Sequence, residues 1–269
     1  MNIIIPMAGH GSKFSNAGFK IPKPFIDIDG KTLIQRAVES INIKNAMYIL
    51  IAQDEHIHKY NLYGIMDLAK VHYKIIHIDE YTTGAAATCL YAEKYIYNDD
   101  ELIITNSDQI LSWEPIAFLN YVRNIYEESK YKVIHGCVIT ISTTDPNYSY
   151  ISLDDNGLAT KLAEKELISN RGLIGLHYWK YGRLFVESAN ELISRDIRAN
   201  NEHYISLTYN MLIERKYSII EYPFDRCGGK QYVVGNPYEL YIFMNTLLKN
   251  KNNINGMQYI GDRIPYALQ

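Results

Sequence analysis

Residues 2–13, NIIIPMAGHGSK, decide the fold of this chain. The apolar run 2–7 predicts a short buried strand, and residues 8–13 form a turn that contains two glycines and a lysine. A strand that ends in such a turn offers backbone N–H groups and a cation, which together bind phosphate. The sequence therefore predicts a phosphate site directly after the first strand.

The spacing of the glycines excludes two common phosphate-binding motifs. Gly9 and Gly11 give GxG, but the third glycine of the dinucleotide fingerprint would fall at Phe14. Gly30-Lys31-Thr32 has the end of a Walker motif, yet Phe25 stands where that motif needs its first glycine. A different class of phosphate loop is therefore required.

The composition of the chain limits its partners and its compartment. Its 269 residues are 47% hydrophobic and 21% charged, as in an ordinary globular protein of one large or two small domains. The net charge of −3 gives no basic surface for nucleic acid or membrane. Three isolated cysteines, and no leader or long apolar run, predict a cytoplasmic protein in a reducing compartment. The oligomeric state stays open, a homo-oligomer included.

Up to about residue 140, apolar runs alternate with helical spacing, which is the βαβ pattern of a parallel sheet. The predicted strands are 2–7, 47–52, 73–78, 101–105 and 131–141, and the predicted helices are 31–42, 55–70, 84–95 and 115–128. Ligands bind beyond the carboxyl ends of such strands. The glycine loop, Thr82-Thr83-Gly84 and Asn106-Ser107-Asp108 each follow a predicted strand, so we expect all three at one edge of the sheet.

After residue 142 the pattern changes to a predicted hairpin, 148–153 and 158–164, and then to mixed strands and helices. The later strands are 173–179 and 218–222, and the later helices are 181–194, 205–215 and 237–248. We expect one α/β domain whose nucleotide-binding core is 1–142 and whose acceptor-binding half with its closing helix is 143–248. Residues 249–269 are expected to form a tail.

Residues 8–14 and Pro22-Lys23-Pro24 together resemble the signature loop of the nucleotidyltransferases that make sugar nucleotides, roughly GGxGTRL…PKP. The resemblance implies a Rossmann-like, mostly parallel α/β sheet of the GT-A-like nucleotidyltransferase type, with an acceptor-binding subdomain. It implies Mg²⁺-dependent transfer of NMP from an NTP to a small phosphorylated acceptor, with release of pyrophosphate. CTP, UTP or dTTP is the expected nucleotide, and decoration of capsule or surface polysaccharide is the expected use.

The resemblance also implies roles for two lysines and for the loop. Lys13 stands where the family usually has the arginine that contacts the β- and γ-phosphates, and a lysine keeps the charge without the bidentate fork. Lys23 matches the lysine that bridges the α-phosphate and the incoming phosphate. The residues implied to hold the triphosphate are Ala8, Gly9, His10, Gly11 and Ser12.

Two further segments resemble the nucleotide and metal sites of the family. Asp108 resembles the aspartate that binds Mg²⁺, with Ser107 beside it in the nucleotide site. Thr83, Gly84 and Ala85 resemble the stretch that frames the nucleobase, and Thr83 also fits as the N-cap of the following helix.

The second half of the chain resembles the acceptor-binding elements more loosely. The residues implied there are Glu164 and Lys165 of a Glu-Lys-Pro-like element, Gly175 of a GxYxF-like strand, and Glu202 and Tyr204 of a Gly-Glu-x-Tyr-like segment. A glycine in a strand also marks a bulge, so Gly175 has an alternative structural explanation.

The segment 232–240 resembles the pattern D-x-G-T-P-E-D-L, but its aspartate, a second metal ligand in many members, falls on Val233. Asp225, shortly upstream, is the alternative second ligand. His56 and His58 do not predict zinc, because residues two apart on a helix point to different faces and no third ligand lies nearby in the sequence.

Several alternatives remain at this stage. The acceptor is a sugar 1-phosphate or a non-sugar phosphate such as phosphocholine or a phosphorylated amino acid. A GT-A-type glycosyltransferase would carry Asp-x-Asp after the fourth strand, where this chain has Ser107-Asp108-Gln109. A non-catalytic nucleotide-binding relative stays open because of Lys13 and Val233.

Overall fold

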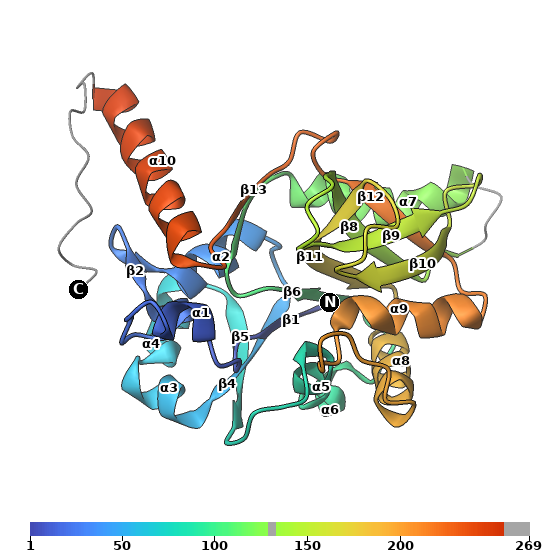
Figure 1. Ribbon diagram of the computed structural model, residues 1–269, viewed down its shortest axis with the longest axis horizontal. Coiled ribbons are helices and arrows are strands. Elements are labelled where there is room, and N and C mark those ends of the chain that lie inside the picture. Colours follow the sequence, from blue (N-terminus) through green and yellow to red (C-terminus); the bar gives the residue numbers. More distant parts are fainter. Residues whose placement is uncertain (129–132, 256–269) are drawn as a thin grey trace.

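The computed structural model describes residues 1–128 and 133–255, and a mixed nine-stranded sheet forms the centre of the molecule (Figure 1). The strand order is β10-β9-β11-β6-β1-β4-β5, while β8 pairs with β11 and β12 pairs with β8. These strands are β1 (Asn2–Pro6), β4 (Met47–Gln53), β5 (His72–Ile78), β6 (Leu102–Thr105), β8 (Gly136–Ser142), β9 (Ser149–Leu153), β10 (Ala159–Glu164), β11 (Arg171–Trp179) and β12 (Ile219–Pro223). Two small sheets pair β2 (Asp27–Ile28) with β3 (Lys31–Thr32), and β7 (Gln109–Ser112) with β13 (Lys230–Val233).

Helices cover both faces of the central sheet. They are α1 (Ser12–Ser15), the 3-10 turn η1 (Lys23–Phe25), α2 (Leu33–Ile41), α3 (Asp54–Lys59), α4 (Leu62–Ala69), α5 (Ala85–Leu90), α6 (Glu93–Ile96), α7 (Pro115–Glu128), α8 (Gly182–Ser194), α9 (Ile205–Glu214) and α10 (Pro237–Asn255). Within the described residues, no helix is long and apolar enough to cross a bilayer.

The strands β6, β1, β4 and β5 form a parallel core, because β1 pairs in parallel with both β4 and β6. A strand buried on both faces reads as a continuous apolar run, as residues 2–7 do. Ile3 and Ile5 pack in a core cluster with residues of α2, α4 and α7. Ile4 points to the other face, in a cluster with residues of α5, α8 and α9. The predicted α/β fold is confirmed.

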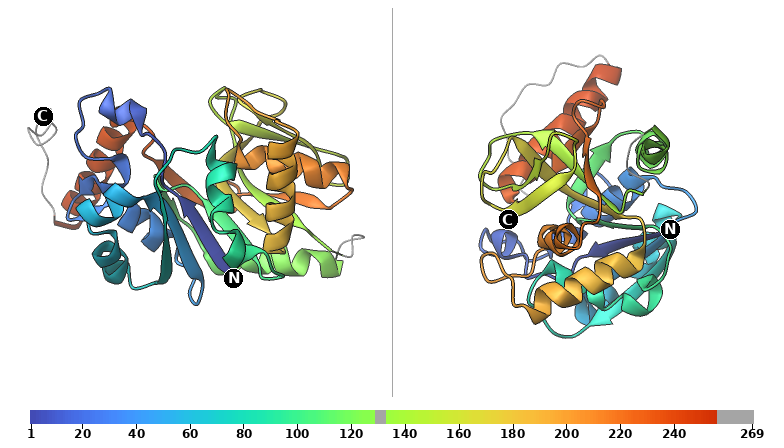
Figure 2. Two further views of the ribbon diagram at one scale, coloured as in Figure 1. Left: turned by 90° about the horizontal axis from the view of Figure 1, so that it is seen from below. Right: turned by 90° about the vertical axis from the view of Figure 1, so that its right-hand side faces the viewer.

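The second half of the chain extends the same sheet instead of forming a separate one. The antiparallel pairing of β11 with β6 joins the parallel core to the hairpin β9–β10. Figure 2 shows this part beside the N-terminal part. The boundary at 142 and 143 stays a prediction. The predicted strand 131–141 begins at Gly136, pairs antiparallel with β11 and lies outside the parallel core; residues 131 and 132 fall outside the described part.

The C-terminal part of the chain returns to the N-terminal half. Strand β13 pairs with β7, and α10 packs in a cluster that includes Phe14, Leu33 and Leu240 (Figure 1). Helix α10 continues to Asn255, past the predicted end at 248, so the first part of the predicted tail is helical. Residues 256–269 lie outside the described part.

Several predicted helices differ from the observed ones for local reasons. The predicted helix 55–70 is two helices, because Asn61 has φ 49° and its side chain caps α4 by accepting a hydrogen bond from the backbone N–H of Gly64. The predicted helix 84–95 is likewise divided into α5 and α6. At 31–42, Thr32 belongs to β3 and caps α2 through its side chain. The short strands β7 and β13 were not predicted.

Candidate active site

Three cavities adjoin at the carboxyl edge of the parallel core. The loop cavity, about 380 Å³, is lined by residues 8–14, Tyr81, Thr82, Gly84, Ala85, Thr88, Glu202, Gly235 and Pro6. The lysine cavity, about 270 Å³, shares the glycine loop and is lined also by residues 19–24, His56 and Ser107. The acidic cavity, about 470 Å³, meets the loop cavity at Lys13, Ala85 and Gly235. The edge predicted from the strand ends is therefore hollowed.

The glycine loop is anchored to the sheet where it leaves β1. The backbone N–H of Met7 donates to the carbonyl of Ile51 at 2.9 Å, and Gln53 Nε2 donates to the carbonyl of Ala8 at 3.2 Å. Beyond Ala8 the loop lines the cavity. A Cβ added at Gly9 would meet nothing within 4 Å. Across the opening, the ring of His10 stacks on Tyr81 with 3.5 Å between centroids.

Lys23 and Asp108 form an ion pair at the base of the site. Lys23 Nζ lies 2.6 Å from Asp108 Oδ2, and the two side chains are 20% and 15% exposed. Lys23 begins η1 and lies between two prolines that fix its backbone. Asp108 lies in the turn between β6 and β7, directly before β7, and its carbonyl accepts a hydrogen bond from the backbone N–H of Val234 at 2.9 Å. The structure thus brings together the two charged residues that the sequence placed in the catalytic and metal sites.

A second carboxylate lies near Asp108 that sequence reasoning missed. A Cβ built on Gly235 would be 3.1 Å from Glu239 Oε2 and 4.0 Å from Asp108 Oδ2, so both oxygens flank this glycine. Glu239 Oε2 accepts a hydrogen bond from the backbone N–H of Gly235 at 2.7 Å, and Asn236 Oδ1 accepts one from the N–H of Glu239 at 3.0 Å. This reciprocal arrangement resembles a capping box. The spacing Asn236-x-x-Glu239 is the sequence pattern from which the position of Glu239 could have been predicted.

Asp225, the alternative second ligand, lies in a different environment. It follows β12 in a turn, and its carboxylate accepts hydrogen bonds from the backbone N–H groups of Ser142 and Arg226. Burial opposes ionisation, but these hydrogen bonds outweigh it and lower the pKa of Asp225. Asp225 is not on the described walls of the three cavities, and its role as a metal ligand stays a prediction.

The segment at Thr83 and Gly84 contacts His203, a buried residue that was not predicted to belong to the site. Thr83 Oγ1 is 2.8 Å from His203 Nδ1, and the N–H of His203 donates to the carbonyl of Thr83 at 2.8 Å. The predicted N-cap role of Thr83 is wrong, because the N-cap of α5 is Gly84. Gly84 has φ 140°, and an added Cβ would lie 2.5 Å from the backbone N of His203, so this position requires glycine.

The acidic cavity is lined by carboxylates and aromatic side chains. Its charged and aromatic residues are Lys13, Asp145, Glu164, Glu239, Tyr148, Tyr204 and His177. Burial raises the pKa of Glu164, while hydrogen bonds from Ser149 and Ser206 partly oppose the shift. Burial lowers the pKa of His177 to about 3, so its imidazole is neutral near pH 7.

Several predicted acceptor residues line this acidic cavity or contact its wall. Gly175 and Tyr204 line it, and Lys165 Nζ lies 3.4 Å from the hydroxyl of Tyr204. Gly175 has φ 80° and sits where the pairing register of β11 with β8 shifts, so it marks a bulge as well. Glu202 lines the loop cavity, not the acidic cavity.

Most of the predicted nucleotide site also meets at one place. The predicted residues on the wall of the loop cavity are Ala8, Gly9, His10, Gly11, Ser12, Lys13, Gly84 and Ala85. Lys23 and Ser107 line the lysine cavity next to it. Thr83 is exposed and contacts His203 behind this wall.

The fold and the site together define a nucleotide-binding α/β protein, with a glycine loop, a lysine–aspartate pair and an adjoining polar cavity. The model of the nucleotidyl transferase family matches residues 2–212, so the chain belongs to this family. Its members are enzymes that transfer nucleotidyl groups, as the sequence predicted.

Two archaeal relatives are similar to part of the chain. The bifunctional protein GlmU of Methanocaldococcus jannaschii is 27% identical over 189 residues, which are 70% of this chain and 41% of the relative. The bifunctional protein GlmU of Methanococcus maripaludis is 24% identical over 256 residues, 80% of this chain and 60% of the relative. The chain thus matches about half the length of these relatives.

Solved structures share the fold. A nucleoside-diphosphate-sugar pyrophosphorylase from Vibrio cholerae RC9 has TM-score 0.74 and 20% identity, covering 90% of this chain and 99% of its own. A UDP-glucose pyrophosphorylase complexed with UDP-glucose has TM-score 0.73 and 21% identity, covering 93% and 98%. The inositol-1-phosphate CTP transferase of T. maritima has TM-score 0.67 and 12% identity, covering 91% and 95%.

We expect Gly84→Ala to lower the free energy of unfolding by about 1–3 kcal/mol, the cost of a residue held in a disfavoured backbone region. The new Cβ would press on the backbone of His203. Gly9→Ala is the matched control, because its Cβ would meet open space; it should keep the stability and weaken nucleotide binding. Urea unfolding and nucleotide titration of both variants check this, and equal stability of the two would contradict it.

Proposed function

We propose that this enzyme transfers NMP from an NTP to a small phosphorylated acceptor and releases pyrophosphate in a Mg²⁺-dependent reaction. The observation that carries the proposal is the Lys23–Asp108 pair beside the glycine loop. It places a cation and a carboxylate next to a phosphate-binding loop, with a second polar cavity adjoining.

The chemistry requires the meeting of two anions. An oxygen of the acceptor phosphate forms a bond to the α-phosphorus of the NTP, and the bond from that phosphorus to the oxygen bridging to the β-phosphate breaks. No general base is needed, since a phosphate is ionised near neutral pH. The demand is to stabilise negative charge as it develops, which preorganised cations and N–H groups do. Lys23 supplies this positive charge at the α-phosphate, and Lys13 supplies it at the leaving pyrophosphate.

The carboxylates suit a hard divalent cation, because Mg²⁺ binds through one or two carboxylates together with substrate phosphates. We infer that Asp108 holds Mg²⁺ and that Glu239 supports it, from the placement of both oxygens around Gly235. When bound, Mg²⁺ would neutralise phosphate charge and orient the reacting groups. The Lys23 ammonium would then leave the carboxylate of Asp108 and pair with the phosphate oxygens of the substrate.

The loop cavity suits the NTP, with its phosphates at residues 8–13 and its base near Thr82, Gly84 and Ala85. We infer a pyrimidine nucleotide, CTP or UTP or dTTP. Two solved structures that share the fold support this choice, since one is a complex with UDP-glucose and the other is a CTP transferase.

The acidic cavity suits the acceptor, and its charge limits the acceptor class. The carboxylates of Asp145 and Glu164 can accept hydrogen bonds from hydroxyl or ammonium groups of the acceptor, and its phosphate would face the loop cavity, which adjoins at Lys13 and Gly235. A sugar 1-phosphate or a phosphorylated amino acid offers such donors. Phosphocholine offers none, but its cation is attracted to the carboxylates and to the ring face of Tyr204.

We infer a cytoplasmic enzyme whose product supplies surface polysaccharide, in line with the free cysteines of a reducing compartment.

Pyrophosphate release is the direct test of the reaction. ATP, CTP, GTP, UTP and dTTP are each incubated with Mg²⁺ and one acceptor from a panel of sugar 1-phosphates, amino-sugar 1-phosphates, phosphocholine and phosphorylated amino acids. We expect release that needs both a pyrimidine NTP and one acceptor. If no combination of nucleotide and acceptor releases pyrophosphate while the protein still binds nucleotide, the result would instead support the non-catalytic relative.

Replacing Lys23 tests the charge at the α-phosphate. Lys23→Ala should keep the fold and lower turnover by roughly 10²–10³, the usual effect of removing one charge-stabilising donor. Lys44→Ala is the control, because Lys44 is exposed and is not on the described walls of the three cavities. Near-normal turnover of Lys23→Ala in the presence of saturating substrates would remove Lys23 from the reaction.

Three carboxylate variants locate the metal ligands. Asp108→Asn and Glu239→Gln should raise the Mg²⁺ concentration that gives half-maximal turnover, because each removes a negative ligand. Asp225→Asn tests the alternative ligand in the same titration. If Asp225→Asn shifts the Mg²⁺ requirement and Glu239→Gln does not, the second carboxylate is Asp225.

A further inference from the structure

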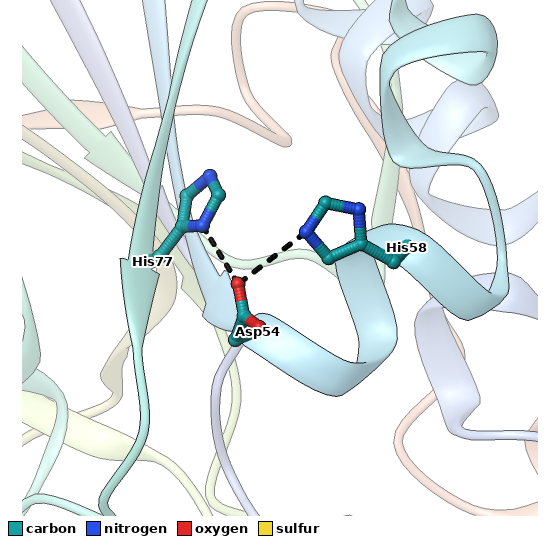
Figure 3. A group of neighbouring side chains, drawn as sticks. All are labelled: Asp54, His58 and His77. Atoms are coloured by element: carbon teal, nitrogen blue, oxygen red, sulfur yellow. Dashed lines mark hydrogen bonds and ion pairs between the residues drawn. The ribbon is translucent and has the colours of Figure 1, made fainter.

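A group of one carboxylate and two imidazoles lies outside the three cavities of the proposed active site. The side chains of Asp54, His58 and His77 converge at the surface (Figure 3). Each offers one ligand atom, and these atoms all lie within 4.8 Å of one another. Asp54 Oδ1 is 2.7 Å from His77 Nδ1 and 3.6 Å from His58 Nε2.

The fold fixes this group through two neighbouring strands and one helix. Asp54 and His58 are one turn apart on α3, so they share a face of that helix. His77 comes from β5, whose parallel register with β4 pairs it with Ala52, just before α3 begins. No zinc site was predicted from the sequence, because only His56 and His58 have a close spacing. The strand pairing brings in His77, which lies 19 residues beyond His58.

We propose that Asp54, His58 and His77 bind a transition-metal ion of the Zn²⁺ class, with water completing the coordination. Two imidazole nitrogens and a carboxylate oxygen are a donor set that Zn²⁺ takes with three protein ligands. Mg²⁺ prefers oxygen ligands, so the same donors discriminate against the ion proposed for Asp108. The two metal sites are thus chemically distinct.

The hydrogen bond of the other ring nitrogen of His77 supports this assignment. His77 Nε2 lies 3.1 Å from the hydroxyl of Tyr63. Histidines that bind metals almost always donate their other N–H to such a partner, which fixes the tautomer. In the metal-free neutral ring, Nδ1–H donates to Asp54 and Nε2 accepts from Tyr63. Metal binding at Nδ1 leaves the proton on Nε2, which then donates to Tyr63; a hydroxyl accommodates both states because it is donor and acceptor.

The position of the group gives the ion a structural role. It would link the start of α3 to the end of β5, at the edge of the sheet that carries the site. Helix α3 also contributes His56 to the wall of the lysine cavity, and Tyr81, shortly after β5, lines both neighbouring cavities. The ligand side chains are between 41% and 67% exposed, so an ion from solution reaches them directly.

Zinc binding to the full chain tests the proposal by calorimetry and by thermal unfolding. Zn²⁺ is titrated first as the only added divalent ion and then in the presence of millimolar Mg²⁺, in both cases without nucleotide. The protein carries Cys227→Ser, which removes the exposed thiol as an alternative ligand. We expect one Zn²⁺ per chain, a raised midpoint of unfolding, and no competition by millimolar Mg²⁺. Loss of a residue that only hydrogen-bonds to a metal ligand typically weakens metal binding by about 10–100-fold. His58→Ala and His77→Ala each remove a ligand itself, so each should weaken Zn²⁺ binding by at least this much.

His72→Ala is the matched control, since His72 is an exposed histidine at the start of the same strand. It should bind Zn²⁺ as tightly as the parent, and Tyr63→Phe should bind it more weakly. The proposal is overturned if the parent binds no Zn²⁺, or if His58→Ala and His77→Ala bind it as tightly as His72→Ala. Because no nucleotide or turnover enters the measurement, its result is independent of the proposed transferase reaction.

Discussion

The ion pair between Lys23 and Asp108 is the interaction on which the proposed site depends. Two segments 85 residues apart in sequence meet there with 2.6 Å between charged atoms. The pair keeps each half-buried charge compensated while no substrate is bound, since an unpaired buried charge is costly. In the proposed reaction, phosphate oxygens would replace Asp108 at Lys23 and Mg²⁺ would replace Lys23 at Asp108. The same pair would thus supply the cation for the phosphate and the carboxylate for the metal.

The rest of the fold positions this pair. The parallel core ends β1 and β6 at the same edge, which sets the glycine loop beside Asp108. The C-terminal part of the chain lies against the same site, because β13 pairs with β7 and α10 packs on the N-terminal half. That return places Gly235 and Glu239 against Asp108. The loop cavity and the acidic cavity, which we propose for the nucleotide and the acceptor, both have Gly235 on their walls.

Sequence alone predicted what is local and periodic. The apolar run at 2–7, the loop that follows it, and Lys23 between prolines are contiguous features. They predicted the fold class correctly, and the phosphate site that they indicate stays a prediction. His203 and Glu239 were missed because their roles come from contacts between distant segments. His77 was missed for the same reason, since strand pairing brings it to His58. The predicted helix 55–70 failed because a left-handed Asn61 breaks it, which periodicity does not reveal.

The most direct test of the account is a crystal structure with a non-hydrolysable pyrimidine NTP and Mn²⁺, whose anomalous signal locates the metal. The account predicts a metal bound to a carboxylate oxygen of Asp108, with Lys23 Nζ turned from Asp108 to the α-phosphate and the triphosphate along residues 8–13. A nucleotide bound in the loop cavity while the Lys23–Asp108 pair stays intact and the metal lies elsewhere would contradict it.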